Sequence, residues 1–172
     1  EDMTRTNLAA YVVVGARHHA ASPGGAHVPA GRWFEGSTTL LPFHASHVFM
    51  VKSVEGAPEA YAREWSGVAW GARRDASGQV QAQLGAEFTE LAIDRAALGE
   101  GVRQLDVLIY LKNLGSDCGG QCEPGWGWTF GATDPTFEPG YGDRILSRYR
   151  RADLEGPTPP AELELRRRFG SE

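Results

Sequence analysis

The stretch Glu87–Lys112, EFTELAIDRAALGEGVRQLDVLIYLK, decides the fold class predicted for this chain. Leu91 and Ile93 fall on one face of a two-residue repeat, which is the pattern of a half-buried β-strand. The residues that follow, Arg95–Leu98, are too few for a stable isolated helix. They therefore predict a single helical turn, which ends at Gly99 because glycine is a common stop after a helix.

A second, longer strand is predicted in the same stretch, with apolar residues on both of its faces. One face carries Leu105, Val107, Ile109 and Leu111. The other face is apolar at Leu108 and Tyr110. A strand that is apolar on both sides is typically central in its sheet and covered on both faces. We therefore expect two strands joined by one helical turn, with the second strand in the core.

Further strands are predicted by β-branched residues and by alternating hydrophobicity. They span Leu8–Ala16, Ser37–Leu41, Ser46–Val54, Ser66–Arg74, Gln79–Leu84, Trp128–Gly131 and Arg144–Tyr149. Pro58 near the start of Ala57–Trp65 favours one or two helical turns there, and Asp75–Gly78 is a hairpin signal. Seven to nine short strands with long Gly- and Pro-rich loops predict an all-β, antiparallel β-sandwich of jelly-roll or immunoglobulin-like type. An eight-stranded barrel is the alternative.

The chain is expected to form one β-sandwich domain over residues 1–152, because 172 residues suit a single core. The composition changes at residues 153–172. Gly156–Pro160 reads as a semi-rigid connector. Glu162–Phe169 begins acidic and ends rich in Arg, a charge order that favours a short helix. This segment is therefore predicted to be a C-terminal tail or linker.

The composition excludes some classes of function. A net charge of −5 argues against nucleic-acid binding, which needs a basic surface. No apolar run approaches the roughly 20 residues that cross a bilayer. The chain begins at Glu1 without Met, so we expect a processed or excised piece of a longer protein. Arg far outnumbers Lys, which occurs only at Lys52 and Lys112 and suggests a GC-rich bacterial source.

Two cysteines, Cys118 and Cys122, lie in the Gly-rich sequence DCGGQCEPG. A zinc site would normally need a second Cys or His pair nearby, and the last histidine of the chain is His47. We therefore expect a short-loop disulfide, which implies an exported protein that is secreted, periplasmic or on the cell surface. The alternative is a pair of reduced thiols in a cytosolic loop.

One family resemblance rests on the sequence ELAIDRAALG followed by an apolar strand. It resembles the late hairpin of family-9-type carbohydrate-binding modules and the related DOMON β-sandwich domains, where a Glu-x-Ala-Ile strand leads into a short turn that ends Leu-Gly. The resemblance covers Tyr61–Tyr149. Asp94 stands where proline is usual, and the opening Asp-Gly…Trp pattern of the family is absent from the first residues. The resemblance implies a β-sandwich that binds glycans.

Aromatic residues in the predicted loops are the candidates for a sugar site. The indole face of Trp stacks on the apolar face of a pyranose, and polar neighbours hydrogen-bond the hydroxyl groups. The candidate ligand-binding residues are Trp33, Trp126, Trp128 and Tyr141. The alternative is that these rings cap the open ends of the sandwich core. We expect the loops Asn113–Gly127 and Asp134–Asp143 to frame the site.

Metal and haem sites are also considered from the sequence. The resemblance implies a structural calcium ion, for which Asp117, Asp134 and Asp143 are candidate ligands in loops. The histidines at positions 18, 19, 44 and 47 either ligate a metal or are exposed or structural. Haem-binding DOMON relatives use Met with His or Lys, so Met50 is a candidate, but strand alternation puts it opposite His47.

No catalytic signature is present. Asp75 with Glu87, or Glu90 with Asp94, can be proposed as a glycosidase pair, but such acidic pairs are abundant by chance. The sequence therefore predicts an exported, non-catalytic carbohydrate-binding module, an accessory domain of a larger enzyme or surface protein. Its partners would be a polysaccharide or glycan and other domains of the same polypeptide. The alternatives are a structural or interaction module of a bacterial envelope or surface assembly without a sugar site, and a DOMON-type haem- or metal-binding domain.

Overall fold

The computed structural model describes residues 3, 8–17, 24–27, 39–113, 129–130, 144–145, 148–155 and 161–164. Every element in these residues is a β-strand except one 3₁₀ turn. All pairs of strands are antiparallel except the short parallel pair of β11 and β3. The all-β, antiparallel fold predicted from the sequence is therefore confirmed, although thirteen strands are described where seven to nine were expected.

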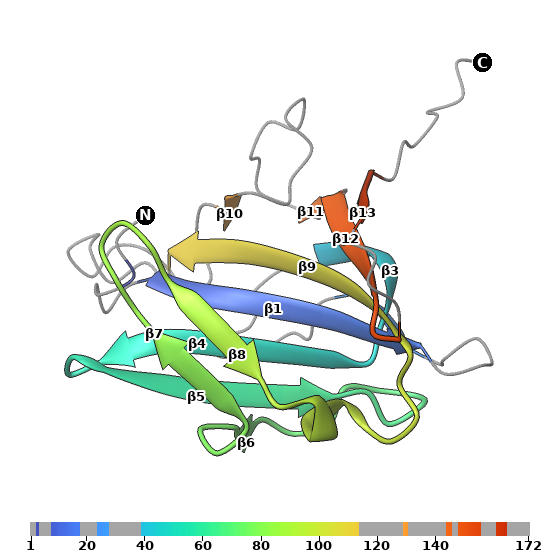
Figure 1. Cartoon of the computed structure of the whole chain (residues 1–172), viewed down its shortest axis with the longest axis horizontal. Helices are drawn as coiled ribbons and strands as arrows, with labels where there is room; N and C mark the ends of the chain where they lie inside the picture. Colours follow the sequence, from blue (N-terminus) through green and yellow to red (C-terminus); the bar gives the residue numbers. More distant parts are fainter. Residues whose placement is uncertain are drawn as a thin grey trace.

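A large, eight-stranded sheet forms the middle layer (Figure 1). Its strand order is β13-β12-β9-β1-β4-β5-β6, with β10 beside β9. The bounds are β1 Leu8–Arg17, β4 His47–Val54, β5 Ala57–Glu64, β6 Arg74–Asp75, β9 Gln104–Asn113, β10 Thr129–Phe130, β12 Arg148–Asp153 and β13 Ala161–Glu164. β9 pairs with β1 over ten residues, which makes these two strands the centre of the sheet.

Two smaller sheets lie on opposite faces of the large one. The first contains β2 Gly25–His27, β3 Thr39–Ala45 and β11 Arg144–Ile145, in the order β11-β3-β2. The second is the hairpin of β7 Val80–Gln83 and β8 Glu90–Ile93, followed by the 3₁₀ turn η1 at Arg95–Leu98. Gly99 ends this turn with a φ of 96°, a conformation that favours glycine. The expected turn and stop are confirmed.

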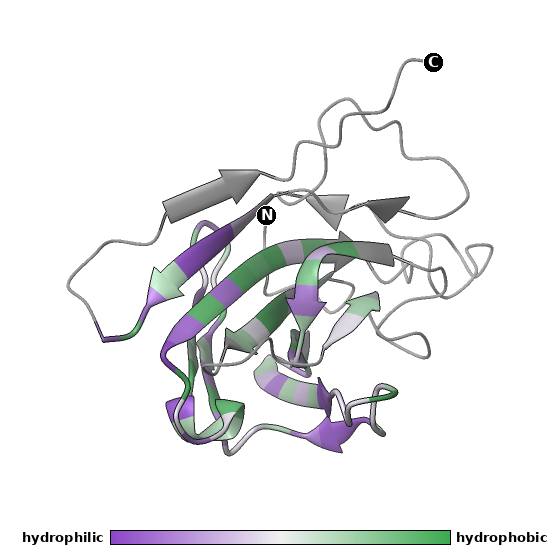
Figure 2. Cartoon of the chain, turned by 90° about the vertical axis from the view of Figure 1, so that its right-hand side faces the viewer, coloured by the Kyte–Doolittle hydropathy of each residue, from purple (hydrophilic) through white to green (hydrophobic). Residues whose placement is uncertain are grey.

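Two hydrophobic cores follow from this layering. The first lies between β3 and the large sheet and includes Tyr11, Met50 and Tyr110. The second lies beneath the β7–β8 hairpin and includes Val12 and Phe49. Neighbouring residues of one strand enter opposite cores because side chains alternate across a strand. Figure 2 shows hydrophobic and hydrophilic bands along the strands.

The helical turns predicted in Ala57–Trp65 are wrong, because Ala57–Glu64 forms β5. β5 pairs with β4 along eight residues, and the turn between them has positive φ at Glu55 (51°) and Gly56 (84°). Two successive residues with positive φ suit the tight turn of a β-hairpin. The helix-forming residues of this segment are overridden by hydrogen bonding to β4, since propensity is weaker than tertiary context.

Two strand boundaries also differ from the prediction. β3 does not end at Pro42 but runs through it to Ala45. The register of β2 on β3 shifts at this place, and proline is tolerated at such an irregularity because its missing N–H is not needed there. In the predicted strand Ser66–Arg74, only Arg74 belongs to a strand, and Trp70 forms an isolated bridge with Trp65.

The turn at Asp75–Gly78 forms, but its two flanking strands do not pair with each other. β6 pairs with β5, whereas β7 pairs with β8. β8 and β9 are likewise not a hairpin, because they belong to different layers. A turn signal fixes a local reversal of the chain, and the choice of partner strand depends on the whole sheet.

The end of the chain differs as well. The predicted last strand Arg144–Tyr149 divides into β11 and β12, which join different sheets. Ala161–Glu164, where a helix was expected to begin, is β13 and pairs with β12. A four-residue segment gains more from the backbone partners of an existing sheet edge than from an isolated helical turn.

Candidate functional site

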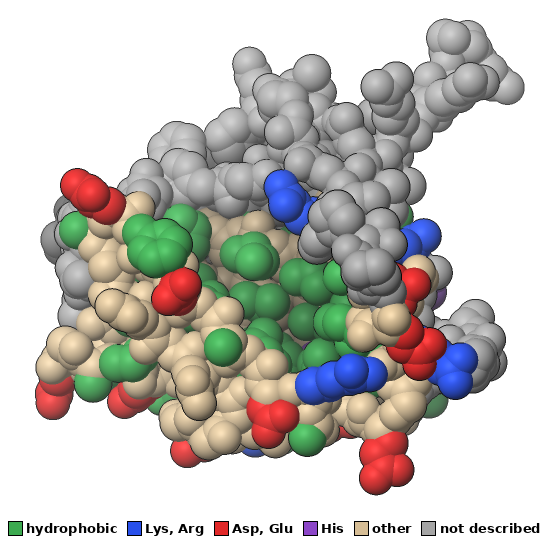
Figure 3. Space-filling view, viewed as in Figure 1, with side chains coloured by type: hydrophobic (Ala, Val, Ile, Leu, Met, Phe, Trp, Pro, Cys, Tyr) green, Lys and Arg blue, Asp and Glu red, His purple; other side chains and the backbone are tan. Residues whose placement is uncertain are grey.

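An apolar trough lies over β9, on the face of the large sheet that carries the β7–β8 hairpin. We define the apolar trough by Leu91 and Ile93 of β8 and by Leu105, Val107 and Ile109 of β9. Four of these side chains are half-buried, and Ile109 is 53% exposed. Figure 3 shows hydrophobic side chains gathered in a hollow over the middle of the sheet.

The apolar trough is open because the hairpin is narrower than the sheet beneath it. Ile109 pairs with Val12 of β1, and Val107 pairs with Val14. Val12 and Val14 are buried, whereas their partners on β9 are not. The prediction that β9 is covered on both faces is therefore wrong for this face. In Figure 1 the two-stranded hairpin crosses only part of the large sheet.

One end of the apolar trough is closed by Met3. This side chain is fully buried against Leu84, Leu91 and Leu111. Its amide donates a hydrogen bond to the carbonyl of Gly85 at 3.2 Å. The position of Met3 shows that an apolar side chain fits between the hairpin and β9 on this face of the sheet.

The two rims of the apolar trough carry opposite charges. Glu87, Glu90 and Asp94 are exposed on or beside the hairpin, and residues 79–94 contain no Lys or Arg. On the other rim, Arg150 of β12 is exposed and pairs with Val107, so that both side chains lie on the same face. The apolar floor is thus bordered by an acidic and a basic side.

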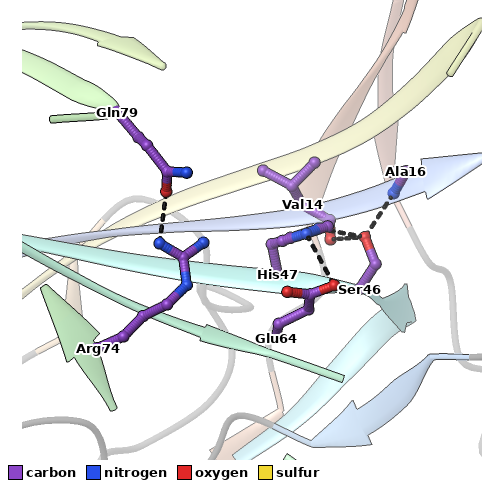
Figure 4. Close-up of polar contacts among 7 residues, drawn as sticks. All are labelled: Val14, Ala16, Ser46, His47, Glu64, Arg74 and Gln79. Carbon is purple, nitrogen blue, oxygen red and sulfur yellow. Dashed lines mark hydrogen bonds and ion pairs between the residues drawn. The ribbon is translucent and has the colours of Figure 1, made fainter. Parts of the chain in front are cut away.

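A polar cluster of Ser46, His47 and Glu64 lies at the start of β4 (Figure 4). The Ser46 hydroxyl donates to the carbonyl of Val14 at 3.1 Å and accepts from the amide of Ala16 at 3.0 Å. The same oxygen is 2.8 Å from Nδ1 of His47. Nε2 of His47 lies 3.9 Å from a carboxylate oxygen of Glu64. The cluster therefore ties together β1, β4 and β5.

This cluster is built for structure and not for nucleophilic catalysis. The Ser46 hydroxyl has one proton, and two backbone groups of β1 already engage it. The His47 side chain is only 6% exposed and stacks on Phe49. Burial lowers the pKa of His47, an effect that outweighs the attraction of Glu64, whose side chain is 63% exposed. The nearby Arg74, which donates a hydrogen bond to Gln79, also lowers that pKa.

Replacing His47 by glutamine should reveal this buried, neutral ring through the pH dependence of stability. The unfolded ring titrates near 6.5, and the folded one titrates lower. The contribution of the neutral His47 ring to the free energy of unfolding is therefore fully present above pH 6.5. It is lost as the pH falls towards the folded pKa, because the unfolded chain takes up a proton at a higher pH than the folded one. We expect the difference in melting temperature between the parent and His47→Gln to shrink from pH 7.5 to pH 5.

The exposed His44, whose Nδ1 lies 2.9 Å from the carbonyl of Gly24, provides the control. The variant His44→Gln should be measured at the same pH values by the same thermal melts. A parent–His47→Gln difference that stays constant across this range would contradict a buried, neutral His47.

The residues predicted to bind sugar or calcium lie outside the described part of the chain. These are Trp33, Trp126, Trp128 and Tyr141 for sugar, and Asp117, Asp134 and Asp143 for calcium. Cys118 and Cys122, with their expected disulfide, also lie outside it, as do His18 and His19. Sugar binding, the disulfide, calcium and export therefore stay predictions. Among the described residues, no group of His, Cys, Asp and Glu could hold a metal ion.

The haem hypothesis loses its proposed pair of ligands. Met50 is buried in the first core, whereas His47 lies on the opposite face beside Phe49. Two side chains on opposite faces of one strand cannot ligate the same iron. The alternation expected from the sequence is confirmed here.

Two of the four candidate glycosidase carboxylates, Asp75 and Asp94, hydrogen-bond to neighbouring residues. Asp75 accepts from the amide and hydroxyl of Ser77, which lowers the pKa of Asp75. Asp94 accepts from the amide of Ala96 and caps η1. Glu90 is exposed on β8. Two of these carboxylates therefore satisfy local turns.

Among the aromatic rings of the described residues, Phe88 is 69% exposed, whereas Tyr61, Trp65 and Trp70 are engaged within the protein. The Tyr61 hydroxyl donates to Glu59 at 2.5 Å, which raises the pKa of Tyr61, and Arg73 lies 4.6 Å above the ring. Trp65 and Trp70 pack edge to face with their centroids 5.5 Å apart. A sugar site on stacked aromatics would therefore depend on Phe88 or on the rings outside the described residues.

No family model, no curated protein and no solved structure matches this chain. Within the described ranges, no helix has the length and apolar character needed to cross a membrane. The apolar trough was not predicted from the sequence. The sequence signal that could have revealed it is a hairpin of two short strands beside a ten-residue strand that is apolar on both faces.

Proposed function

We propose that this chain is a non-catalytic interaction module that binds a partner through the apolar trough. The observation that supports this is the exposure of Ile109, in a strand paired on both sides within the large sheet. A β-branched residue in such a strand is normally buried. Contiguous apolar surface on a soluble protein is often an interaction site, because leaving it in water has a free-energy cost.

The chemistry of the apolar trough favours an apolar ligand over a glycan. Its floor is aliphatic, with Leu105, Val107 and Ile109 in place of flat aromatic rings. Sugar binding needs stacking surfaces and several hydrogen-bonding groups, whereas aliphatic walls contact aliphatic or aromatic side chains. The geometry therefore supports the interaction-module hypothesis better than the glycan-binding one.

Binding of the apolar dye 1-anilinonaphthalene-8-sulfonate tests this proposal. We expect the folded parent to bind the dye saturably, and Ile109→Ser to reduce the fluorescence increase by about half or more, since it places a hydroxyl in the floor. The control is Val68→Ser, because Val68 is 86% exposed and lies outside the trough. Thermal melts must show that each variant folds, since partly unfolded proteins also bind this dye. Equal fluorescence in the parent and Ile109→Ser would contradict the proposal.

A further inference from the structure

In the part of the chain that the structure describes, the edge of β8 that faces away from β7 is unpaired, and this edge borders the apolar trough. Among the described residues, β8 pairs only with β7. The amide of Asp94 donates to the carbonyl of Gln79 at 2.8 Å, so the backbone groups of Asp94 point towards the strand that leads into β7. Backbone groups alternate between the two edges of a strand. Those of Leu91 and Ile93 therefore point to the open edge.

The same two residues also send their side chains towards the large sheet. Leu91 and Ile93 pack against the second core, whereas Glu90 and Ala92 are exposed on the outer face. A strand added to the open edge would lie about 4.8 Å from β8 and about 10 Å above the large sheet. Its inward side chains would then reach the floor formed by β9. The edge and the floor thus suit one ligand, an extended peptide strand.

We propose that the apolar trough binds an extended peptide that adds as a strand to the open edge of β8. The peptide alternates apolar side chains, which enter the trough, with Lys or Arg, which face outward. This inference rests on the proposed function and specifies its ligand. Backbone hydrogen bonds to Leu91 and Ile93 hold the strand, and contacts with Ile109 select the apolar residues.

The charge of the hairpin favours a basic peptide. Glu87, Glu90 and Asp94 are its charged residues, and all three are exposed. Glu90 lies on the outer face of β8, where the outward side chains of an added strand would be its cross-strand neighbours. Opposite charges across neighbouring strands are favourable, and like charges are unfavourable.

A second copy of this chain fits the edge less well. Antiparallel pairing of two β8 strands that matched Leu91 with Ile93 would place Glu90 of one copy opposite Asp94 of the other, twice. The apolar trough is also small, because it is defined by five residues, whereas a standard interface between proteins uses roughly 20–30 residues on each side. The size and charge of the site therefore favour a single peptide strand.

Isothermal titration with synthetic peptides tests the inference. The probe is an acetylated and amidated heptapeptide, Lys-Val-Lys-Val-Lys-Val-Lys, and the charge control replaces each Lys by Glu. We expect the basic peptide to bind at least about tenfold more tightly than the acidic one, a difference of about 1.4 kcal/mol. The protein variant Glu90→Lys should reduce this preference, whereas Glu55→Lys, in the exposed β4–β5 turn, should not.

Backbone methylation separates strand addition from simple apolar contact. Methyl groups on the valine nitrogens block an antiparallel strand from pairing with β8, whereas methyl groups on the lysine nitrogens block a parallel one. We expect one of the two methylated peptides to lose about tenfold in affinity and the other to bind like the parent peptide. Equal affinity of both, or equal loss in both, would overturn the inference.

The two proposals fail in distinguishable ways. If the dye binds in an Ile109-dependent manner but no peptide does, strand addition is wrong and the interaction surface remains. If neither the binding of the dye nor the binding of the peptide depends on Ile109, both proposals are wrong. A dimer in size-exclusion chromatography that dissociates in Ile109→Ser would identify a second copy as the occupant and overturn the peptide inference.

Discussion

Replacing Tyr110 by alanine is expected to lower the free energy of unfolding by about 4 kcal/mol. Tyr110 is fully buried and pairs with Tyr11 across β9 and β1. Their rings stack with centroids 4.8 Å apart and an interplanar angle of 2°. Truncation removes this stacking and leaves a cavity between the large sheet and β3, which rigid strands cannot close.

The adjacent Ile109 supplies the matched control, because it lies on the opposite face of the same strand. Ile109→Ala removes a side chain that is 53% exposed, so we expect a loss of about 1 kcal/mol or less. Denaturant unfolding of both variants measures the two changes. Similar losses in the two variants would mean that the two faces of β9 are equally buried, which would contradict the apolar trough.

Replacing Arg151 by alanine is expected to lower the free energy of unfolding by about 3 kcal/mol. Nε and Nη2 of Arg151 donate to the two carboxylate oxygens of Asp106 at 2.7 and 3.2 Å. Asp106 is 1% exposed, so the variant leaves its carboxylate buried without the guanidinium. The hydrogen bond to Asp106 also raises the pKa of Arg151.

An exposed ion pair in the same region provides the comparison. Arg103 lies 3.1 Å from Glu155, with both side chains about half exposed, so Arg103→Ala should change stability by about 0.5 kcal/mol. Chemical denaturation at low and high salt measures both variants. If Arg151→Ala and Arg103→Ala lowered the free energy of unfolding equally, the burial of Asp106 would not make its ion pair more important for stability than an exposed one.

Local sequence patterns predicted the strands that show a strong two-residue alternation or many β-branched residues. β1, β4, β8 and β9 were found within one to three residues of their bounds. The turn at η1 and its stop at Gly99 were also found, because a short segment after a strand and a glycine with positive φ are both local properties. Segments with weak local preference, such as Ala57–Glu64 and Ala161–Glu164, were assigned to helix and are strands.

The candidate site could not be predicted in the same way. Leu108 and Ile109 are adjacent and both apolar, yet one is fully buried and the other is more than half exposed. Their sequence gives no reason for this difference. It arises because β3 covers one face of the large sheet, whereas the β7–β8 hairpin leaves β9 uncovered on the other.

The sequence by itself determined that this chain is an antiparallel β protein, because period-two alternation, β-branched residues and frequent turns are encoded over a few residues each. Only the tertiary structure decided which strands became neighbours, which face of β9 stayed open, and that the open edge of β8 lies beside it. These features depend on contacts between segments far apart in the chain, for which a local pattern carries no information. The apolar trough is therefore a property of how the layers overlap, and not of any motif.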